Sequence, residues 1–185
     1  MDRDGVINEK PPEGEYVESW QAFHLLNGVP EAIARLNRAG LLVLVVSNQR
    51  GIALGRHSEE GVDTIHANLQ ETLEARGAHL DGIYCCPHNK DQCDCRKPAP
   101  GLFYQAVAAH PQLRGETSVM IGDSLSDIEF GKRLRMLSIF IQGDPTRRKA
   151  GSEAATNLAD AVCRSLAEAV NLLLDRNANQ DRSSA

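Results

Sequence analysis

Six consecutive apolar residues occupy positions 41–46 and are followed directly by the polar sequence Ser47-Asn48-Gln49. A strand with one face in water alternates apolar and polar side chains, whereas this run does not alternate. Its second half is rich in β-branched valine, which favours extended backbone. The pattern therefore predicts a strand that is buried on both faces, as in a parallel sheet.

Segments with helical spacing separate this strand from further short apolar runs. Residues 28–36 have Pro30 near the first helical position and Gly40 as a terminator. A second helix is predicted at residues 58–76, ending before Gly77. Further helices are predicted at residues 101–110, 126–135 and 165–174, and further strands at residues 82–85, 118–121 and 137–141. Because strands and helices alternate, we predict an α/β fold with a doubly wound, Rossmann-like parallel sheet.

The chain has 185 residues, of which 42% are hydrophobic, enough for one domain with a continuous core. We assign residues 1–176 to this domain and residues 177–185 to a polar tail. The formal charge of −5 argues against a surface for nucleic acid or an anionic membrane. No apolar run approaches the roughly 18 residues of a membrane span, and we expect no secretory leader. We therefore expect a cytoplasmic monomer whose partner is a small molecule, with no nucleic-acid or membrane contact.

Polar residues follow the ends of the predicted strands. Asp2 and Asp4 are separated by one residue and followed by a glycine, and side chains two apart in an extended segment point to the same side. Both can address one ligand, such as a metal ion with a phosphate, although the same letters also open calcium loops and ordinary turns. Ligands of doubly wound sheets bind beyond the carboxyl ends of the strands. Residues 86–97, Ser47-Asn48 and Asp123 are therefore expected to converge with this segment.

Four of the five cysteines fall between Cys85 and Cys95, and in a reducing compartment this density indicates metal ligation rather than disulfides. Three thiolates and one imidazole make an ordinary tetrahedral zinc set, here Cys86, His88, Cys93 and Cys95. The segment is too short for the ββα unit of a DNA-reading finger. Cys85 competes with Cys86 for the first position, but strand alternation turns Cys85 the other way. The alternative is a group of free, partly buried cysteines.

Four motifs occur in an order that is known from one enzyme family. They are Asp-x-Asp-Gly-Val from Asp2, Ser47 after an apolar strand, Lys97, and Gly-Asp-Ser-x-x-Asp from Gly122 to Asp127. In this order and spacing the sequence resembles the haloacid dehalogenase-like phosphatases over most of its length. Asp-Arg-Asp-Gly, Ser-Asn-Gln-Arg-Gly-Ile-Ala and Cys-Asp-Cys-Arg-Lys-Pro resemble the subgroup that contains D,D-heptose 1,7-bisphosphate phosphatases and histidinol-phosphatases.

The resemblance implies a two-step phosphoryl transfer that depends on Mg²⁺. Asp2 is the expected nucleophile and gives an aspartyl-phosphate, while Asp4 protonates the leaving group and then activates water. The expected Mg²⁺ ligands are Asp2, the backbone carbonyl of Asp4, and Asp123. Ser47 and Lys97 are expected to bind the phosphoryl oxygens and to neutralise their charge.

No large cap domain is expected, so three loops would line the substrate site: residues 9–16, residues 50–56 and the zinc loop. Arg50 and Arg96 are expected to bind a second phosphate by bidentate contacts, with ordinary surface arginines as the alternative. The expected substrate-binding residues are completed by Asn48, Gln49 and Tyr16.

Two residues near the zinc loop receive supporting roles. Zn²⁺ would order the loop that ends in Arg96 and Lys97 without taking part in the reaction. Asp127 is expected to orient Lys97 or to cap its own helix rather than to ligate Mg²⁺.

The resemblance leaves three functions open. The first is hydrolysis of the C7 phosphate of D-glycero-D-manno-heptose 1,7-bisphosphate, on the route to nucleotide-activated heptose. The second is hydrolysis of histidinol phosphate. The third is a non-catalytic sugar-phosphate binding protein of the same fold, against which we note that every catalytic position is filled.

The segment before Asp2 does not match the predicted fold. Asp2 should stand at the carboxyl end of a central strand of about five or six residues, but Met1 alone precedes it here. We therefore expect the sheet to be split and the first strand to be missing from this chain, with the natural protein starting further upstream. The alternative is that neighbouring strands close the gap.

Overall fold

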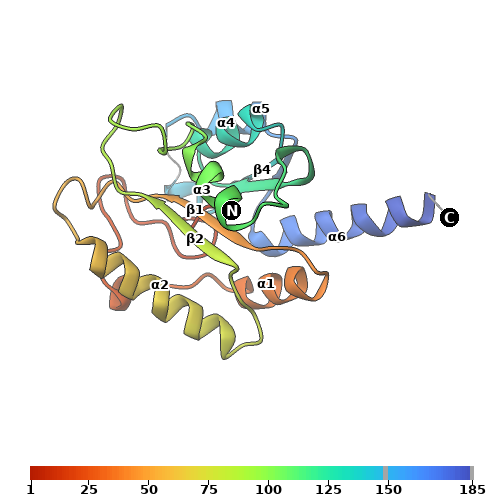
Figure 1. Cartoon of the computed structure of the whole chain (residues 1–185), viewed down its shortest axis with the longest axis horizontal. Coiled ribbons are helices and arrows are strands. Elements are labelled where there is room, and N and C mark those ends of the chain that lie inside the picture. The colour runs from red at the N-terminus through yellow and green to blue at the C-terminus, as the bar shows by residue number, and fades with distance from the viewer. Residues whose placement is uncertain (148–149, 184–185) are drawn as a thin grey trace.

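The computed structural model describes residues 1–147 and 150–183, and the predicted α/β alternation is confirmed (Figure 1). The strands are β1 (Leu44–Asn48), β2 (Gly82–Cys86), β3 (Val119–Gly122), β4 (Leu137–Ile141) and β5 (Ala161–Cys163). The α-helices are α1 (Val29–Arg38), α2 (Glu59–Glu74), α3 (Gly101–Ala109), α4 (Leu125–Arg133), α5 (Ser152–Leu158) and α6 (Leu166–Ser183). Three short 3-10 helices are η1 (Trp20–Ala22), η2 (Gly115–Thr117) and η3 (Pro145–Arg147).

The named strands pair in parallel as two groups, β1 with β2 and β3 with β4 and β5. The N-terminal backbone lies between the groups. The Met1 amino group donates to the Leu44 carbonyl at 2.7 Å, and the Met1 carbonyl accepts from Val46 N–H at 2.9 Å. On the other side, Asp2 N–H donates to the Ile121 carbonyl at 2.9 Å. The order across the molecule is thus β2, β1, Met1 with Asp2, β3, β4 and β5, which is a doubly wound order.

Next to Met1, a hollow of about 630 Å³ separates the two groups of strands. Its walls are mostly apolar and include Leu44 and Val46 of β1, Val119 of β3, and Phe103 of α3. The expected division of the sheet is therefore confirmed for the named strands. The hydrogen bonds of Met1 and Asp2 connect the two parts, at Leu44 and Val46 of β1 and at Ile121 of β3.

Successive strand residues point to opposite faces of the sheet and meet different helices there. Val45 and Ile121 belong to one core cluster, to which α1, α2 and α6 contribute. Their neighbours Val46 and Met120 belong to a second cluster, to which α3 and α4 contribute. Figure 1 shows α1 and α2 on one side of the strands and α3 and α4 on the other. Helices thus cover both faces, as the unbroken apolar run predicted.

Several boundaries differ from the sequence-based expectations. β1 begins at Leu44 instead of position 41, because Leu41 and Leu42 lie outside the sheet and are 37% and 40% exposed. Helix α5 and strand β5 were not predicted. Helix α6 continues to Ser183, past its expected end at Leu174, and the sequence holds no glycine or proline there. Residues 184–185 of the predicted tail lie outside the described residues.

Neither a large cap domain nor a membrane-spanning helix was expected from the sequence. Within residues 1–147 and 150–183, the connections between elements hold no large cap domain. In the same ranges, no helix has the length and apolar character that a membrane crossing needs.

The contact of α4 with the sheet depends on Gly131, where an added Cβ would lie 2.3 Å from Ser138 Oγ and 2.9 Å from Met120 Cβ. We predict that Gly131→Ala lowers the free energy of unfolding by about 1–3 kcal/mol, because the extra methyl group must push α4 away from the strands. Urea denaturation followed by circular dichroism measures this change.

The matched control is Gly61→Ala in α2, where the nearest neighbour of a Cβ would be Ser58 Oγ at 3.4 Å. Alanine favours the helix by about 0.8–1 kcal/mol over glycine, so this variant should be at least as stable as the original chain. A similar loss of stability in both variants would contradict the packing argument.

Candidate active site

The loop after Asp2 turns sharply at Gly5 and brings Asp2 beside Asp123. Gly5 has a φ of +89° and donates its N–H to the Asn8 carbonyl at 2.8 Å. A Cβ on this residue would lie 2.1 Å from Oδ2 of Asp123. Glycine is therefore needed here for its left-handed conformation and for its lack of a side chain.

Asp2, Asp123 and Asp127 form a cluster of carboxylates at the carboxyl end of β3. One oxygen of each lies within 4.8 Å of the others, and the residues are only 9%, 7% and 0% exposed. Carboxylate oxygens are the ligands that Mg²⁺ prefers, so the cluster fits this ion. Burial raises the pKa of Asp123 to about 7, although the Lys10 ammonium acts in the opposite direction. The Asp4 carboxylate is not part of the cluster.

Lys97 provides positive charge to this cluster. Its Nζ donates to Asp2 Oδ1 at 2.8 Å and to the Val46 carbonyl at 2.6 Å, and it pairs with Asp127 Oδ1 at 2.6 Å. Burial by itself lowers the pKa of Lys97, but the Asp127 and Asp2 carboxylates outweigh burial and raise it. The Asn48 amide fixes the backbone of Lys97, donating to its carbonyl at 3.1 Å and accepting from its N–H at 3.0 Å.

Asp127 has both of the supporting roles that were expected for it. Oδ1 pairs with Lys97, while Oδ2 accepts from the backbone N–H and the hydroxyl of Ser124 at 3.0 and 2.5 Å. These bonds form the capping box at the start of α4. Its place in the carboxylate cluster goes beyond the expectation, because Asp127 lies close enough to Asp2 and Asp123 to contact the same ion.

Asp4 is held by a separate set of donors. Arg3, which is 0% exposed, donates from Nη2 to Asp4 Oδ1 at 3.0 Å, and Asn8 donates to the same oxygen at 2.9 Å. Gln49 donates to the other oxygen at 3.3 Å. Burial raises the pKa of Asp4, but the guanidinium of Arg3 and the two amides outweigh burial and lower it. The arrangement therefore favours the ionised carboxylate.

Ser47 is 1% exposed and accepts a hydrogen bond from Gln49 Nε2 at 2.8 Å. Because its oxygen is the acceptor in this bond, its own O–H can donate to another group. Gln49 is 2% exposed, and its carbonyl accepts from Arg3 at 3.2 Å. Gln49 thus links Ser47 to the Arg3 and Asp4 pair.

The four predicted zinc ligands come together in one cluster. The ligand atoms of Cys86, His88, Cys93 and Cys95 all lie within 4.8 Å of one another. Individual separations include 3.5 Å between the Cys86 and Cys93 sulfurs and 3.3 Å between His88 Nδ1 and the Cys95 sulfur. Such a group of three sulfurs and one nitrogen fits a tetrahedral ion such as Zn²⁺. Cys85 is outside the cluster, and burial raises its pKa to about 12.

The three loops that were expected to line the site contact one another. Arg50 Nε donates to Asn89 Oδ1 at 2.6 Å, which connects the loop at residues 50–56 to the zinc loop. The rings of Tyr16 and His57 pack edge to face with centroids 6.0 Å apart, which connects the first loop to the residue that follows the second. Arg96 extends along the zinc loop, with Nη1 3.5 Å from a backbone carbonyl.

Comparison with known proteins identifies the family of the chain. A family model described as HAD-hydrolase-like matches residues 94–169. The D-glycero-alpha-D-manno-heptose-1,7-bisphosphate 7-phosphatase of Mycobacterium tuberculosis is 37% identical over 169 residues, 91% of this chain and 86% of the relative. The D-glycero-beta-D-manno-heptose-1,7-bisphosphate 7-phosphatase of Vibrio cholerae is 40% identical over 171 residues, 88% of this chain and 90% of the relative. The chain belongs to the haloacid dehalogenase-like phosphatases.

A solved member of this phosphatase family has the same fold over almost its full length. It is the D,D-heptose 1,7-bisphosphate phosphatase from B. bronchiseptica, crystallised with magnesium and phosphate. Its TM-score is 0.81, with 28% identity over 95% of this chain and 96% of the other. This coverage leaves no room for a large domain that only one of the two chains contains.

In the present chain, the expected catalytic residues lie together at one edge of the strands. Asn48 and Gln49 bond within the protein, to Lys97 and to Ser47, so their expected contact with substrate stays a prediction. Arg50, Arg96 and Tyr16 lie on the surrounding loops, and their contact with substrate is likewise a prediction.

Two residues of the site, Arg3 and Lys10, were not predicted from the sequence. The position of Arg3 between two motif aspartates could have indicated its role. The polar stretch around Lys10 contains no pattern that would indicate a role for Lys10 in the site.

The buried Arg3 also contacts His66 of α2, whose Nε2 lies 3.1 Å from Arg3 Nη1. Burial and the nearby guanidinium lower the pKa of His66 to about 4 from its ordinary 6.5. Because the folded pKa lies below the unfolded one, His66 contributes stability above pH 6.5 that is lost as the pH falls toward 4. We predict that this loss approaches about 3 kcal/mol of unfolding free energy.

Chemical denaturation at pH values from 7.5 to 4 measures this effect. His66→Gln removes the titrating ring, so its stability should depend less on pH over this range than that of the original chain. His24→Gln, at an exposed position, is the control and should keep the original dependence. Equal pH dependence in the original chain and His66→Gln would show that the prediction is wrong.

Proposed function

We propose that this chain is a Mg²⁺-dependent phosphatase that removes the C7 phosphate of D-glycero-D-manno-heptose 1,7-bisphosphate. The observation that carries the proposal is the Asp2 carboxylate, bonded to Lys97 and beside Asp123, in a chain whose relatives are named for this reaction. A phosphoryl group brought to this edge of the strands would meet a nucleophile, a cation and a hydroxyl donor together.

Asp2 is the proposed nucleophile. Lys97 holds its Oδ1 at 2.8 Å, so that the other carboxylate oxygen can attack phosphorus and the bond from phosphorus to the sugar oxygen breaks. Water then attacks the phosphorus of the aspartyl-phosphate, and the bond to Asp2 breaks to release inorganic phosphate. The ammonium of Lys97 and the O–H of Ser47 are proposed to bind phosphoryl oxygens through both steps.

A bound Mg²⁺ supplies positive charge that lowers the repulsion between the carboxylate and the phosphate dianion. Asp2, Asp123 and the backbone carbonyl of Asp4 are its proposed ligands. The grouping of Asp2 and Asp123 oxygens within 4.8 Å supports this set.

Asp4 is the proposed acid and base. Its lowered pKa suits the second step, in which an ionised carboxylate takes a proton from the attacking water. Donating a proton to the leaving sugar oxygen requires the protonated form, which the bonds from Arg3 and Asn8 disfavour. We therefore propose that substrate binding loosens the contact between Arg3 and Asp4 before the first step.

The second phosphate of the substrate is proposed to meet Arg50 and Arg96. The bond from Arg50 to Asn89 links the loop of Arg50 to the zinc loop, which carries Arg96. A guanidinium can contact two phosphate oxygens at once, which suits a sugar with a phosphate at each end. Asn48, Gln49 and Tyr16 are proposed to complete the substrate site.

Zn²⁺ is the proposed occupant of the Cys86, His88, Cys93 and Cys95 cluster. The last of these ligands is two residues before Lys97, so the ion would fix the segment that carries this lysine and Arg96. Its proposed role is structural, because the Asp2 carboxylate is not part of that cluster.

We further propose that the protein is a monomer and that it acts in the cytoplasm, where thiols stay reduced.

Phosphate release from purified substrates tests the proposed reaction. We predict that the chain with Mg²⁺ releases phosphate from at least one anomer of heptose 1,7-bisphosphate with a kcat/KM well above that for histidinol phosphate. Asp2→Asn should abolish release, because a neutral amide cannot form the acyl-phosphate. A preference for histidinol phosphate would overturn the substrate assignment, and near-original activity of Asp2→Asn would overturn the covalent mechanism.

The zinc proposal is tested by elemental analysis of protein purified without chelators. We predict about one zinc per chain, and loss of zinc with a higher KM in Cys93→Ser, because the loop with Arg96 loses its order. Cys163→Ser, in the core and outside the cluster, is the control and should retain zinc. Zinc-free protein from the original chain would exclude the assignment.

A further inference from the structure

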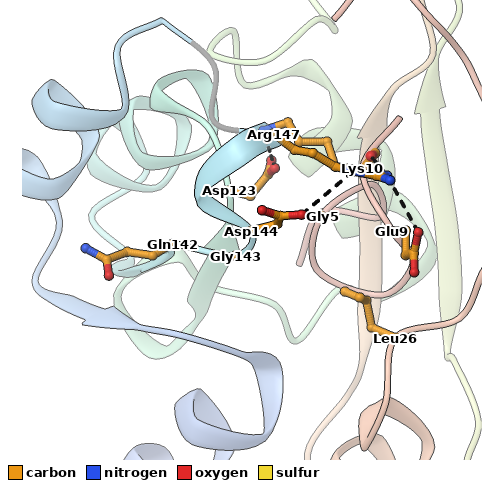
Figure 2. A pocket seen from close by; sticks show the side chains of 9 residues that line it. All are labelled: Gly5, Glu9, Lys10, Leu26, Asp123, Gln142, Gly143, Asp144 and Arg147. Atoms are coloured by element: carbon orange, nitrogen blue, oxygen red, sulfur yellow. Dashed lines mark hydrogen bonds and ion pairs between the residues drawn. The ribbon is translucent and has the colours of Figure 1, made fainter. Parts of the chain in front are cut away.

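Lys10 forms an ion pair with Asp123, one of the proposed Mg²⁺ ligands. Its Nζ contacts Asp123 Oδ2, and the two side chains are only 8% and 7% exposed. Arg147 donates to the backbone carbonyl of Lys10 at 2.6 Å and so fixes the segment that carries it. Figure 2 shows Lys10 and Arg147 next to one another, close to Asp123 and Asp144.

We propose that Lys10 is a built-in competitor of Mg²⁺ for Asp123. In the metal-free protein its ammonium neutralises this carboxylate, and it moves away from Oδ2 when the ion binds. The inference deepens the proposed function, on which it depends for the identity of the ion. It gives Lys10 a positioning role and does not place it in contact with the reacting atoms.

The distribution of charge around the cluster supports this role. Asp2 and Asp127 share the ammonium of Lys97, so they keep a positive partner whether or not an ion is bound. Asp123 instead pairs with Lys10. A buried carboxylate is strongly destabilising without a partner, so Lys10 stabilises the metal-free fold. A divalent ion beside the same ammonium would face repulsion, which is strong in a buried site.

The structure also offers Lys10 a place to move into. A hollow of about 230 Å³ adjoins Lys10 and Asp123 and is lined in addition by Glu9, Asp144 and Arg147. The carboxylates of Glu9 and Asp144 lie 3.6 and 3.9 Å from Arg147 and are about half exposed. An ammonium that leaves Asp123 can therefore stay near negative charge and near water.

Titration calorimetry with MgCl₂ and thermal denaturation with and without Mg²⁺ test the inference without an activity assay. For Lys10→Met we expect Mg²⁺ affinity to rise by roughly tenfold, because a like charge has been removed from the site. We also expect a lower midpoint than the original chain without Mg²⁺ and a larger rise when the ion is added. Lys10→Arg keeps a positive charge beside Asp123, so its Mg²⁺ affinity should stay within about twofold of that of the original chain.

The control variant is Lys132→Met, which removes a lysine paired with Asp160 at 2.5 Å on the surface, away from the cluster. It should leave the Mg²⁺ affinity unchanged. If Lys10→Met does not fold, Lys10→Gln provides the same test with a neutral side chain that can still hydrogen-bond Asp123.

The outcomes separate this inference from the proposed function. Unchanged or weaker Mg²⁺ binding in the neutral variants would overturn the role of Lys10 and leave the metal site intact. Failure of the original chain to bind Mg²⁺ at all would overturn the proposed metal site together with this inference.

Discussion

The ion pairs of Lys97 with Asp2 and Asp127 are the interactions on which the rest of the site depends. They join three distant segments: the N-terminal loop, the end of the cysteine-rich loop and the first turn of α4. All three side chains are buried, so removing Lys97 would leave two carboxylates in the interior without their shared cation. The hydrogen bonds of Asn48 to the Lys97 backbone add a fourth segment, the end of β1.

The parallel arrangement of the strands explains why these segments meet. Each strand runs in the same direction, so the loops at the carboxyl ends all emerge at one edge. The backbone of Met1 and Asp2 bonds to β1 on one side and to β3 on the other, which places Asp2 between the two loops that carry its partners. Gly5 then allows the chain to turn close to Asp123, because a Cβ at this position would lie only 2.1 Å from Asp123 Oδ2.

Charge balance organises the carboxylates into two groups. Asp4 is neutralised by the buried Arg3 and stays outside the cluster, whereas Asp2 and its neighbours share two lysines. The pKa shifts follow this division, because Asp4 is shifted down and Asp123 up. At Asp4 the Arg3 guanidinium and the amide donors outweigh burial, whereas at Asp123 burial outweighs the Lys10 ammonium.

Much of the fold and site could be predicted because the signals are local. The unbroken apolar run before Ser47 predicted a strand covered on both faces. The spacing of the cysteines and the histidine predicted a cluster of ligands, and the structure brings Cys86, His88, Cys93 and Cys95 together. Short elements such as β5 escaped prediction, since three residues carry too little periodicity to distinguish a strand from a loop.

The sequence by itself determined which residue types are available and in what order, and this was enough for the alternation of elements, the motif aspartates, Ser47 and Lys97. Only the tertiary structure decided how the charges are paired. Lys10 contacts Asp123 across 113 positions of sequence, and Arg3 pairs with the neighbouring Asp4. Such pairings arise because folding buries these side chains together, and a buried charge must find its partner among whatever groups the fold brings within reach.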